Sequence, residues 1–312
     1  MLKKIKKKEI VAVLLTTCNS EKFLETQIES ILCQKHVTVH IYISDDNSFD
    51  GTLTILEKYF LKYPKNFKKL YKVNFKNSNK NFINLIKIVP SNYKYYALCD
   101  HDDYWLKNKL SRAVSILNKG YSAYGCRLKV VDKNLNFLGF YSELLTRPLS
   151  FKNALVQGIV GNATLVFNNN ICKIFKKNKI NFVTDTAWLV YLITTYLGYN
   201  FFYDKKSMIK YRQHAGNVHS ISSSLYSRLK RIFTKIITKA DKISNDNHIN
   251  LLQKIKNNRC KENILVLNKF DFMRKNLFFI YFSLNYFKKL GIYRQTKIGN
   301  IRLITSLIFK LQ

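Results

Sequence analysis

Short apolar runs alternate along the first hundred residues with segments in which apolar side chains recur every three or four positions. The runs at 9–17 (EIVAVLLTT), 37–44 (VTVHIYIS) and 95–99 (YYALC) have the length and content of buried strands. The segments after the first two runs, 21–32 and 52–63, show the spacing of amphipathic helices. We therefore expect strands and helices in alternation from the start of the chain.

The remaining elements of this part continue the alternation. Asn19 or Ser20 can cap the first helix, since short polar side chains accept hydrogen bonds from its first free N–H groups. A short strand near 69–74 and a helix near 81–89 precede the strand YYALC. This β-α-β-α-β order predicts an α/β fold with a mostly parallel sheet flanked by helices.

Acidic residues gather at the ends of the predicted strands. Three strand ends carry TTCNS, SDDNS and CDHDD, and the last two hold six of the 19 acids of the chain. These are Asp45, Asp46, Asp50, Asp100, Asp102 and Asp103. In open parallel sheets ligands bind beyond the carboxyl ends of the strands, so this convergence is the main functional signal of the sequence.

Two interpretations of the acidic strand ends compete. The pair Asp100 and Asp102 offers hard oxygen ligands to Mg²⁺ or Mn²⁺, ions that keep open positions for substrate phosphates. Alternatively, Asp102 or Asp103 caps a helix over 105–117, whose dipole tolerates negative charge. For SDDNS the alternative is an Asx-type turn. Because two neighbouring strand ends are acidic, we favour the metal.

The chain after Ser220 has a different character. Residues 221–312 contain 19 Lys and Arg against four acids, with apolar residues interleaved. The segments 228–240, 263–270 and 277–290 have the pattern of amphipathic helices, which either rest on anionic lipid or pack on the catalytic domain with a lysine-rich outer face. We expect a catalytic domain over 1–220 and a basic amphipathic helical region over 221–312.

Composition adds a strong positive charge. The formal net charge of +34 implies an anionic partner, although an AT-rich genome also enriches Lys without selection on charge. The six cysteines show no metal-ligand spacing and are expected as buried, reduced thiols of a cytoplasmic protein. The N-terminal apolar run IVAVLL is shorter than the core of a usual signal peptide, and no run reaches the length of a membrane span.

Four blocks of the sequence, taken together, match a known family. VLLTTCNSEKFLETQIESILCQ, VHIYISDDNSFDGT, YYALCDHDDYWLKNKL and IKYRQHAGN occur in that order. The sequence resembles bacterial family-2 glycosyltransferases of the GT-A fold, in particular a rhamnosyltransferase-like branch, over about residues 8–220. This resemblance implies a Rossmann-like GT-A domain, here followed by a C-terminal α-helical region.

The resemblance also implies a donor site. Thr16 matches the position where base and ribose rest, Asp46 matches the acid that binds the base with Asp45 as support, and Asp100 and Asp102 match the D-x-D that meets ribose and metal. Cys18 stands where many relatives carry a stacking aromatic. The implied nucleotide-sugar residues are Thr16, Asn19, Asp45, Asp46, Asp100, Arg212 and Gln213. The implied metal ligands are Asp100, Asp102 and His214, although a lone His is also compatible with a packing role.

An acceptor site is implied on the same grounds. Asp185 resembles the acid that precedes a Trp-Leu pair and takes the acceptor proton. Two residues separate it from Trp188 where relatives often have one, and the alternative is that it caps the following helix. The implied acceptor-side residues are Gly161, Asn162, Asp103 and Trp188, with Gly161 allowing a close backbone approach.

The resulting expectation is an inverting, metal-dependent hexosyltransferase of class EC 2.4. It would move a hexose from a dTDP- or UDP-linked sugar to a growing O-antigen, capsule or lipooligosaccharide, with Mn²⁺ or Mg²⁺ as cofactor. It would work at the cytoplasmic face of the inner membrane, on a glycan or lipid-linked acceptor. Two alternatives stay open. A nucleic-acid-binding protein fits the charge but lacks any recognised motif, and a nucleotidyltransferase lacks a Gly-rich phosphate loop.

Overall fold

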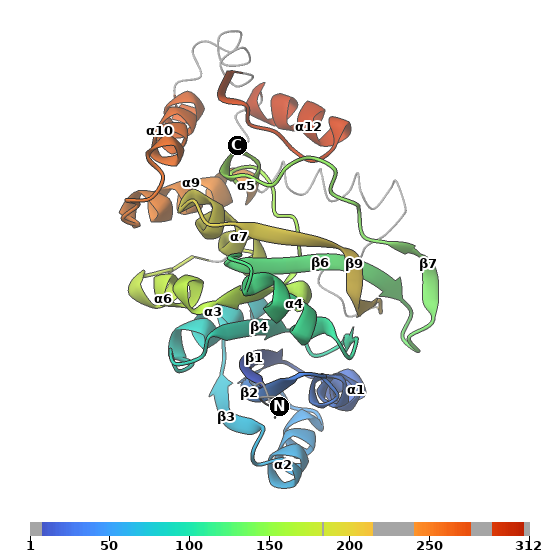
Figure 1. Cartoon of the computed structure of the whole chain (residues 1–312). Coiled ribbons are helices and arrows are strands. Elements are labelled where there is room, and N and C mark those ends of the chain that lie inside the picture. The colour runs from blue at the N-terminus through green and yellow to red at the C-terminus, as the bar shows by residue number, and fades with distance from the viewer. Residues whose placement is uncertain (1–7, 183, 215–239, 276–288, 309–312) are drawn as a thin grey trace, which may run out of the picture. The chain divides into compact units, whose positions relative to one another are not determined.

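The computed structural model of the protein describes residues 8–182, 184–214, 240–275 and 289–308 (Figure 1). Contacts divide the chain into two compact units, which are described separately below. The first unit consists of Met1–Leu144, Val160–Lys179 and Phe202–Asn217, and the second of Leu145–Ile159, Ile180–Phe201 and Val218–Gln312. The first unit therefore ends close to the boundary expected at 220. The second unit also takes two internal segments, a grouping that no sequence pattern indicated.

One nine-stranded sheet organises the first unit. Its strands are β1 (Glu9–Thr17), β2 (Val37–Asp46), β3 (Phe67–Val73), β4 (Tyr95–Cys99), β5 (Tyr104–Trp105), β6 (Ala123–Val131), β7 (Phe137–Tyr141), β8 (Val166–Asn168) and β9 (Phe201–Arg212). They lie in the order β3-β2-β1-β4-β8-β6-β9-β5, and β7 pairs with β6. The first four strands are parallel, as the sequence predicted, whereas β5 to β9 pair antiparallel. The α/β fold is confirmed, with a mixed sheet.

Helices cover both faces of this sheet (Figure 1). They are α1 (Glu21–Leu32), α2 (Thr52–Lys62), α3 (Ser78–Ile88), α4 (Lys109–Leu117) and α6 (Asn169–Lys177), with the 3-10 helix η1 at Asn162–Thr164. Side chains of α1, α2 and α4 join one core cluster with Val11, Val13 and Leu15. The helices α3 and α6 supply no residue to that cluster and contact the strands from the opposite side. Residues 11–15 of β1 are therefore all apolar, because this part of the strand is buried on both faces.

The helix expected over 105–117 is shorter than its pattern predicted. α4 begins at Lys109 with Asn108 as N-cap, while Trp105 lies in β5 and pairs with Ile209 of β9. The Trp105 side chain is buried, and the Lys109 amine lies 3.5 Å from the centre of its ring. Strand pairing therefore removes the residues after CDHDD from the helix, and neither Asp102 nor Asp103 caps it.

The second unit is helical. It contains α5 (Phe151–Ala154), α7 (Thr186–Tyr196), α9 (Ala240–Lys254), α10 (Lys261–Lys275) and α12 (Lys297–Ile308). Ten of the 11 residues of α7 are buried, as is typical of a helix surrounded by other elements. Asn257 and Asn263 donate to the carbonyl of Tyr196 at the end of α7. The expected C-terminal helical region is therefore present.

The structure describes only part of the amphipathic segments predicted for the C-terminal region. The segment 228–239 and most of 277–290 lie outside the described residues. The apolar residues of α10 occur both on its buried side, as with Phe270, and in exposed positions, as with Phe272. Within the described ranges, no helix has the length and apolar character needed to cross a bilayer.

The cysteines depart in part from the expectation of buried thiols. All six are free, and Cys99, Cys126 and Cys172 are buried. Cys18 and Cys33 are exposed and Cys260 is intermediate. Burial was inferred from residue type alone, and these three lie at or beside element ends, where side chains reach solvent.

Candidate active site

The first two strand ends lie side by side in the first unit. Parallel pairing sets Thr17 of β1 opposite Asp45 of β2. The Asp45 carboxylate is buried and accepts hydrogen bonds from the Thr17 hydroxyl at 2.7 Å and from the Ser48 backbone N–H at 2.9 Å. The Asx-type turn considered from the sequence is therefore present, and Asp45 shapes the loop that follows β2.

Asp46 binds a different loop. Its carboxylate accepts backbone N–H groups from Phe75, Lys76 and Asn77, which lead into α3. These hydrogen bonds hold the loop after β3 at the end of β2. The predicted contact of Asp46 with a nucleotide base would add to this structural role.

The loop after β1 is braced against the loop after β2. Asn19 has a positive φ of 48°, its backbone N–H donates to the Ser48 hydroxyl, and its side-chain oxygen accepts from the Phe49 N–H. Thr16 is 4% exposed, whereas Cys18 next to these residues is exposed. The donor-site residues expected from the first two strand ends are thus brought together.

The ends of β4 and β9 bring two of the three predicted metal ligands together. The Asp102 carboxylate oxygen lies 3.0 Å from Nε2 of His214, and their side chains are 13% and 19% exposed. Within the part of the chain that the structure describes, no three His, Cys, Asp or Glu side chains converge as a cation site. The structure therefore groups Asp102 with His214, but does not group Asp100 with them.

Arg212 holds this arrangement in place. It is 3% exposed, and its Nε donates to the Asp102 carbonyl at 2.8 Å. Its backbone N–H donates to Asp103 at 2.9 Å, and its Nη1 donates to the Lys133 carbonyl. The adjacent Gln213 donates its backbone N–H to the Val131 carbonyl. Both residues therefore connect β9 with β6, in addition to any contact with phosphate.

Asp103 lies deeper than an acceptor-side residue would. Its side chain has no exposed surface, and its Oδ2 has no hydrogen-bond partner among the described residues. Burial raises the pKa of the Asp103 carboxyl, and the charges of Asp102 and Asp100 raise it further. The expected acceptor-side position does not agree with this burial, because the carboxyl supports β9 from inside.

Two further residues belong to the site and were missed. Phe23 of α1 lies with its ring centre 4.8 Å from that of His214 and 4.4 Å from the Arg212 guanidinium carbon. His101 makes a hydrogen bond with the Thr16 backbone, and burial lowers its pKa. The only sequence signal for Phe23 is an aromatic residue beside the buried Leu24 in the first turn of α1.

Gly161 and Asn162 lie at the start of η1 in the first unit, Gly161 as its N-cap and Asn162 as its first residue. Space beside the Gly161 Cα is open, since a side-chain carbon there would meet nothing within 4 Å. This open space leaves room for the expected close approach of an acceptor, which stays a prediction. The Asn162 amide nitrogen lies 3.3 Å from the Asn79 side-chain oxygen, and its own oxygen is buried without a hydrogen-bond partner among the described residues.

Asp185 and Trp188 lie in the second unit. Asp185 is the N-cap of α7, and its carboxylate accepts the Trp188 backbone N–H at 2.9 Å. This bond joins the N-cap to the third helical residue, which explains the two-residue spacing noted in the sequence. The Trp188 indole donates to the Ala154 carbonyl at 2.7 Å. Capping and a catalytic role are compatible, because a carboxylate accepts through two oxygens.

The residue before Asp185 contacts the C-terminal region. The Thr184 hydroxyl lies 2.6 Å from Nε2 of His248 in α9. The His248 ring is 4.8 Å from that of Trp188, and its Nδ1 has no partner among the described residues. Burial lowers the pKa of His248 to about 3. A neutral histidine therefore supports the loop that carries Asp185.

We expect this histidine to make the folded protein sensitive to acid. Below its ordinary pKa of 6.5 the unfolded chain binds a proton at His248 that the folded chain excludes down to about 3. Acid therefore favours unfolding in this window, by about 1.4 kcal/mol per pH unit. Denaturant unfolding should show that His248 lowers the free energy of unfolding by about 1.4 kcal/mol between about pH 7.5 and about pH 5.5. His248→Gln should lack that loss, and equal pH slopes in both proteins would contradict the expectation.

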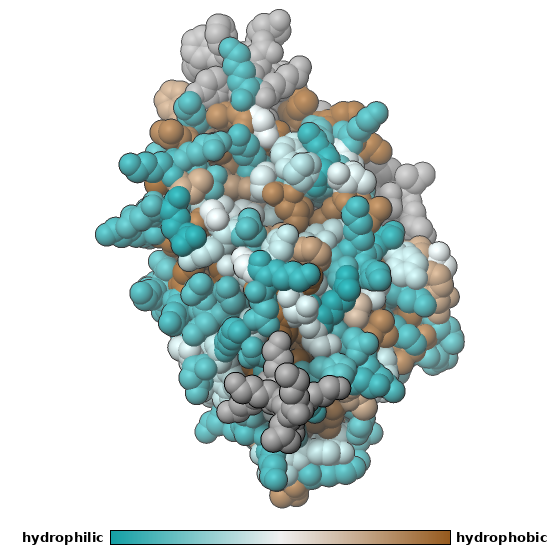
Figure 2. Space-filling model, viewed as in Figure 1, coloured by the Kyte–Doolittle hydropathy of each residue, from teal (hydrophilic) through white to brown (hydrophobic). Residues whose placement is uncertain are grey.

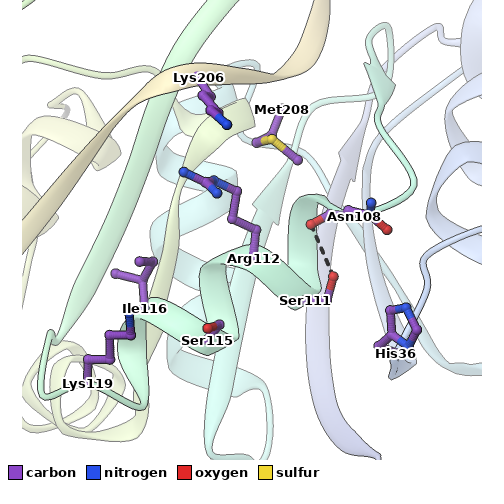
Figure 3. Close-up of a pocket in the computed structure, with 9 residues that line it drawn as sticks. All are labelled: His36, Asn108, Ser111, Arg112, Ser115, Ile116, Lys119, Lys206 and Met208. Atoms are coloured by element: carbon purple, nitrogen blue, oxygen red, sulfur yellow. Dashed lines mark hydrogen bonds between the residues drawn. The ribbon is translucent and has the colours of Figure 1, made fainter.

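A groove of about 580 Å³ lies elsewhere in the first unit (Figure 3). Arg112 of α4 and Lys206 of β9 line it, together with His36 before β2. It contains none of the predicted site residues, and His36 marks the opposite end of β2 from Asp45 and Asp46. The Arg112 guanidinium is already paired with Asp204. The strand ends, and not this groove, hold the candidate chemistry.

Comparison with known proteins settles the family. The model of the family described as "Glycosyl transferase family 2" matches residues 12–212. The chain belongs to glycosyl transferase family 2. A relative in this family, the dTDP-rhamnosyl transferase RfbG of Shigella flexneri, is 32% identical over 262 residues, which make up 76% of this chain and 86% of that protein. The expected enzyme class, a hexosyltransferase of EC 2.4, is confirmed.

Solved glycosyltransferases share the fold. TarS of S. aureus, residues 1–349 in complex with UDP-GlcNAc, matches with a TM-score of 0.56 at 18% identity, covering 96% of this chain and 87% of that one. The mannosyltransferase PcManGT of Pyrobaculum calidifontis, in complex with GDP-Man and Mn²⁺, matches with a TM-score of 0.53 at 12% identity, covering 97% and 80%. These similarities confirm the GT-A architecture of this family 2 enzyme.

Proposed function

We propose that this enzyme transfers a hexose, with inversion, from a nucleotide diphosphate sugar to a growing cell-surface glycan such as O-antigen, capsule or lipooligosaccharide. The observation that carries the proposal is the Asp102–His214 pair at 3.0 Å, at the polar ends of the sheet in a family 2 domain. The similarity to a dTDP-rhamnosyl transferase makes dTDP-rhamnose the first donor to test, with UDP-linked sugars next.

The paired side chains fit a divalent cation. Neighbouring ligands of an octahedral Mg²⁺ lie about 3 Å apart, since each bond is about 2.1 Å, and the Asp102 and His214 atoms are 3.0 Å apart. A carboxylate with few other protein ligands is usual for an ion that also binds substrate phosphates. Asp102 and His214 would hold Mn²⁺ or Mg²⁺, with Asp100 nearby in sequence. When bound, the ion would neutralise charge on the departing diphosphate.

The other residues of the first unit would bind the donor. Thr16, Asn19, Asp45 and Asp46 shape the two loops where the base and ribose would rest. Phe23 supplies an aromatic ring beside His214, in a family whose members often carry one at the position of Cys18. Arg212 and Gln213 would lie beside the diphosphate, and the positive charge of Arg212 favours that anion even while its nitrogens bond to the backbone.

Asp185 would take the proton from the acceptor hydroxyl. Its carboxylate is held at the start of α7 by the Trp188 N–H, and the neutral His248 supports the preceding Thr184. Inverting transfer needs one such base, and a fixed side chain accepts the proton without first losing rotamer freedom. Trp188 in the second unit, and Gly161 and Asn162 in the first, stay acceptor-side proposals that rest on the sequence resemblance alone.

Thermal stability in the presence of candidate donors tests the proposal. A ligand that binds only the folded protein raises the melting temperature, by mass action. We expect dTDP-rhamnose with Mn²⁺ to raise it more than UDP-glucose, UDP-GlcNAc or GDP-mannose do. If none of these sugars raises the melting temperature, with or without metal, the proposed donor class is contradicted.

We further propose that the C-terminal helices rest on the anionic cytoplasmic face of the inner membrane. Apolar side chains are exposed on α10 at Leu265 and Phe272 and on α12 at Ile298 and Ile301. Residues seven or three apart share a helix face, so each helix presents an apolar pair. The surrounding chain holds 19 basic residues against four acids over 221–312. Apolar pairs within basic helices suit the surface of anionic lipid.

Vesicle binding should follow from these two features. We expect the enzyme to bind vesicles of phosphatidylglycerol and phosphatidylcholine, and to bind less as salt screens the lipid charge. Replacing Leu265, Phe272, Ile298 and Ile301 with Ser should weaken binding at least ~10-fold, since each side chain loses apolar burial. A matched replacement of exposed Leu61 in α2, 84% exposed, should not. If the full chain ignores anionic vesicles, the basic residues are a solvated surface only.

A further inference from the structure

The hairpin formed by β6 and β7 exposes a group of aromatic and cationic side chains that the donor site does not use. Phe137 and Tyr141 of β7 are 43% and 41% exposed. The Lys129 amine lies 4.6 Å from the Phe137 ring centre, and the Arg127 guanidinium carbon lies 5.0 Å from that of Tyr141. Phe137, Tyr141, Arg127 and Lys129 are called the hairpin platform here. Figure 2 shows hydrophobic surface over β7, with hydrophilic surface beside it.

The backbone is bent to bring the two rings together. In a regular strand, residues four apart are separated by about 13 Å, yet the Phe137 and Tyr141 ring centres are 5.1 Å apart. Between them Gly139 has a φ of +84°, a left-handed conformation that other residues adopt only with strain. A side chain at Gly139 would meet nothing within 4 Å, so the space beside Gly139 is open. Phe137 and Tyr141 therefore form one aromatic surface on either side of a residue without a side chain.

The cations of the platform have capacity for a ligand. Lys129 forms no ion pair among the described residues, and Arg127 donates from Nε to the Ser142 carbonyl at 2.7 Å, which leaves its terminal nitrogens available. The nearest acid in the hairpin turn, Asp132, already accepts the backbone N–H groups of Asn134 and Asn136. An anionic group is therefore attracted to this surface, and a guanidinium binds carboxylate or phosphate in a forked geometry.

The hairpin is joined to the donor site through its turn. The Val131 carbonyl accepts the Gln213 N–H at 2.8 Å, and the Lys133 carbonyl accepts from Arg212. Arg212 in turn donates to the Asp102 carbonyl. All of these residues belong to the first unit. The platform is thus continuous with the elements that hold the predicted metal ligands, and is not an isolated surface patch.

We propose that the hairpin platform binds the acceptor as a negatively charged saccharide. The apolar C–H face of a sugar ring would stack on Phe137 and Tyr141, and its carboxylate or phosphate would bind Arg127 and Lys129. Aromatic rings offer large, rigid contact area at low entropic cost, and the positive net charge of the chain attracts an anionic glycan. This inference rests on the proposed function, since it names the acceptor class of the same enzyme.

Binding of defined oligosaccharides tests the platform without knowledge of the natural acceptor. The probes are tetragalacturonate, a phosphorylated maltotetraose and neutral maltotetraose, titrated by saturation-transfer NMR into the full-length enzyme. We expect at least one charged probe to bind at least ~5-fold more tightly than maltotetraose, and the better one identifies the anionic group. Phe137→Ala with Tyr141→Ala should weaken that binding at least ~10-fold, which corresponds to about 1.4 kcal/mol.

Separate variants divide the two halves of the platform. Arg127→Gln with Lys129→Gln should remove the difference between charged and neutral probes. Leu138→Ala, which changes a neighbouring side chain that is 43% exposed and lies outside the hairpin platform, is the matched control and should bind like the wild type. Equal binding of charged and neutral probes, or no effect of the ring variants, would overturn the proposal.

The same samples distinguish this inference from the proposed function. Release of dTDP from dTDP-rhamnose by water needs the donor site but no acceptor. If the wild type releases dTDP but the platform variants bind glycan as the wild type does, the platform alone is refuted. If the wild type releases no dTDP, the donor proposal is refuted. In sedimentation experiments, the wild-type enzyme should not form a dimer that is lost in the Phe137→Ala variant. Such a dimer would mean that a second copy covers these rings, and would also refute the platform.

Discussion

Replacing Asp102 with Asn should reduce glycosyl transfer by at least ~100-fold while the protein remains folded. The amide keeps the size of the side chain but removes the charge that a divalent cation requires. The Asp102 side chain is 13% exposed and its carboxylate contacts His214, so an amide of the same size should fit in its place. Mn²⁺ affinity, followed by electron paramagnetic resonance, should fall together with activity, and EDTA should abolish transfer by the wild type.

Glu57→Gln provides the matched control for this experiment. Glu57 lies exposed on α2, so its replacement removes one negative charge without touching the strand ends. Its activity and Mn²⁺ affinity should equal those of the wild type. Full transfer in the presence of EDTA, or normal activity of Asp102→Asn, would remove the metal from the proposal.

Asp185→Asn should slow transfer at least ~100-fold without loss of donor binding. A general base contributes typically ~10²–10⁴-fold to the rate, and Asn cannot take a proton at neutral pH. Asn still caps a helix, so the bond to the Trp188 N–H can persist in the variant. The measurement is kcat for acceptor transfer, compared with the donor-induced shift in melting temperature.

Two further replacements separate capping from catalysis at this position. Asp185→Ser retains a capping oxygen and should also be inactive but stable. Asp185→Ala should be inactive and lose about 1 kcal/mol of stability as well, because the cap is removed. Near-normal transfer by Asp185→Asn would assign the base to another carboxylate. Asp103 is a poor candidate for that role, since its side chain has no exposed surface.

The central strands of the first unit could be predicted because they are buried on both faces. The middle of such a strand, 11–15 in β1, is apolar at successive positions, so its pattern stands out from the polar loops that follow. The ends of these strands are then fixed by parallel pairing, which is why TTCNS and SDDNS meet in space. The short strand β5 could not be predicted, because its two residues are defined by pairing with the distant β9.

The site was predictable only where residues act through type and spacing. Asp102 and His214, two of the implied metal ligands, lie 3.0 Å apart, while their binding of a metal stays a prediction. Phe23 was missed because its role comes from contacts with Arg212 and His214, which are remote in sequence. The burial of Asp103 could not be predicted either, because the sequence does not show which of the adjacent acids faces the core. His248 was not considered, because its contact with Thr184 arises from packing within the second unit.

Release of nucleoside diphosphate from dTDP-rhamnose is the most direct test of the central claim. The claim is that Asp102 and His214, at the polar ends of a family 2 sheet, serve transfer from a nucleotide sugar. With Mn²⁺ present, the wild-type enzyme should release dTDP, and Asp102→Asn should release at least ~100-fold less, while Glu57→Gln matches the wild type. Release at the same rate by wild type and Asp102→Asn, or no release from dTDP- or UDP-linked sugars, would contradict the account.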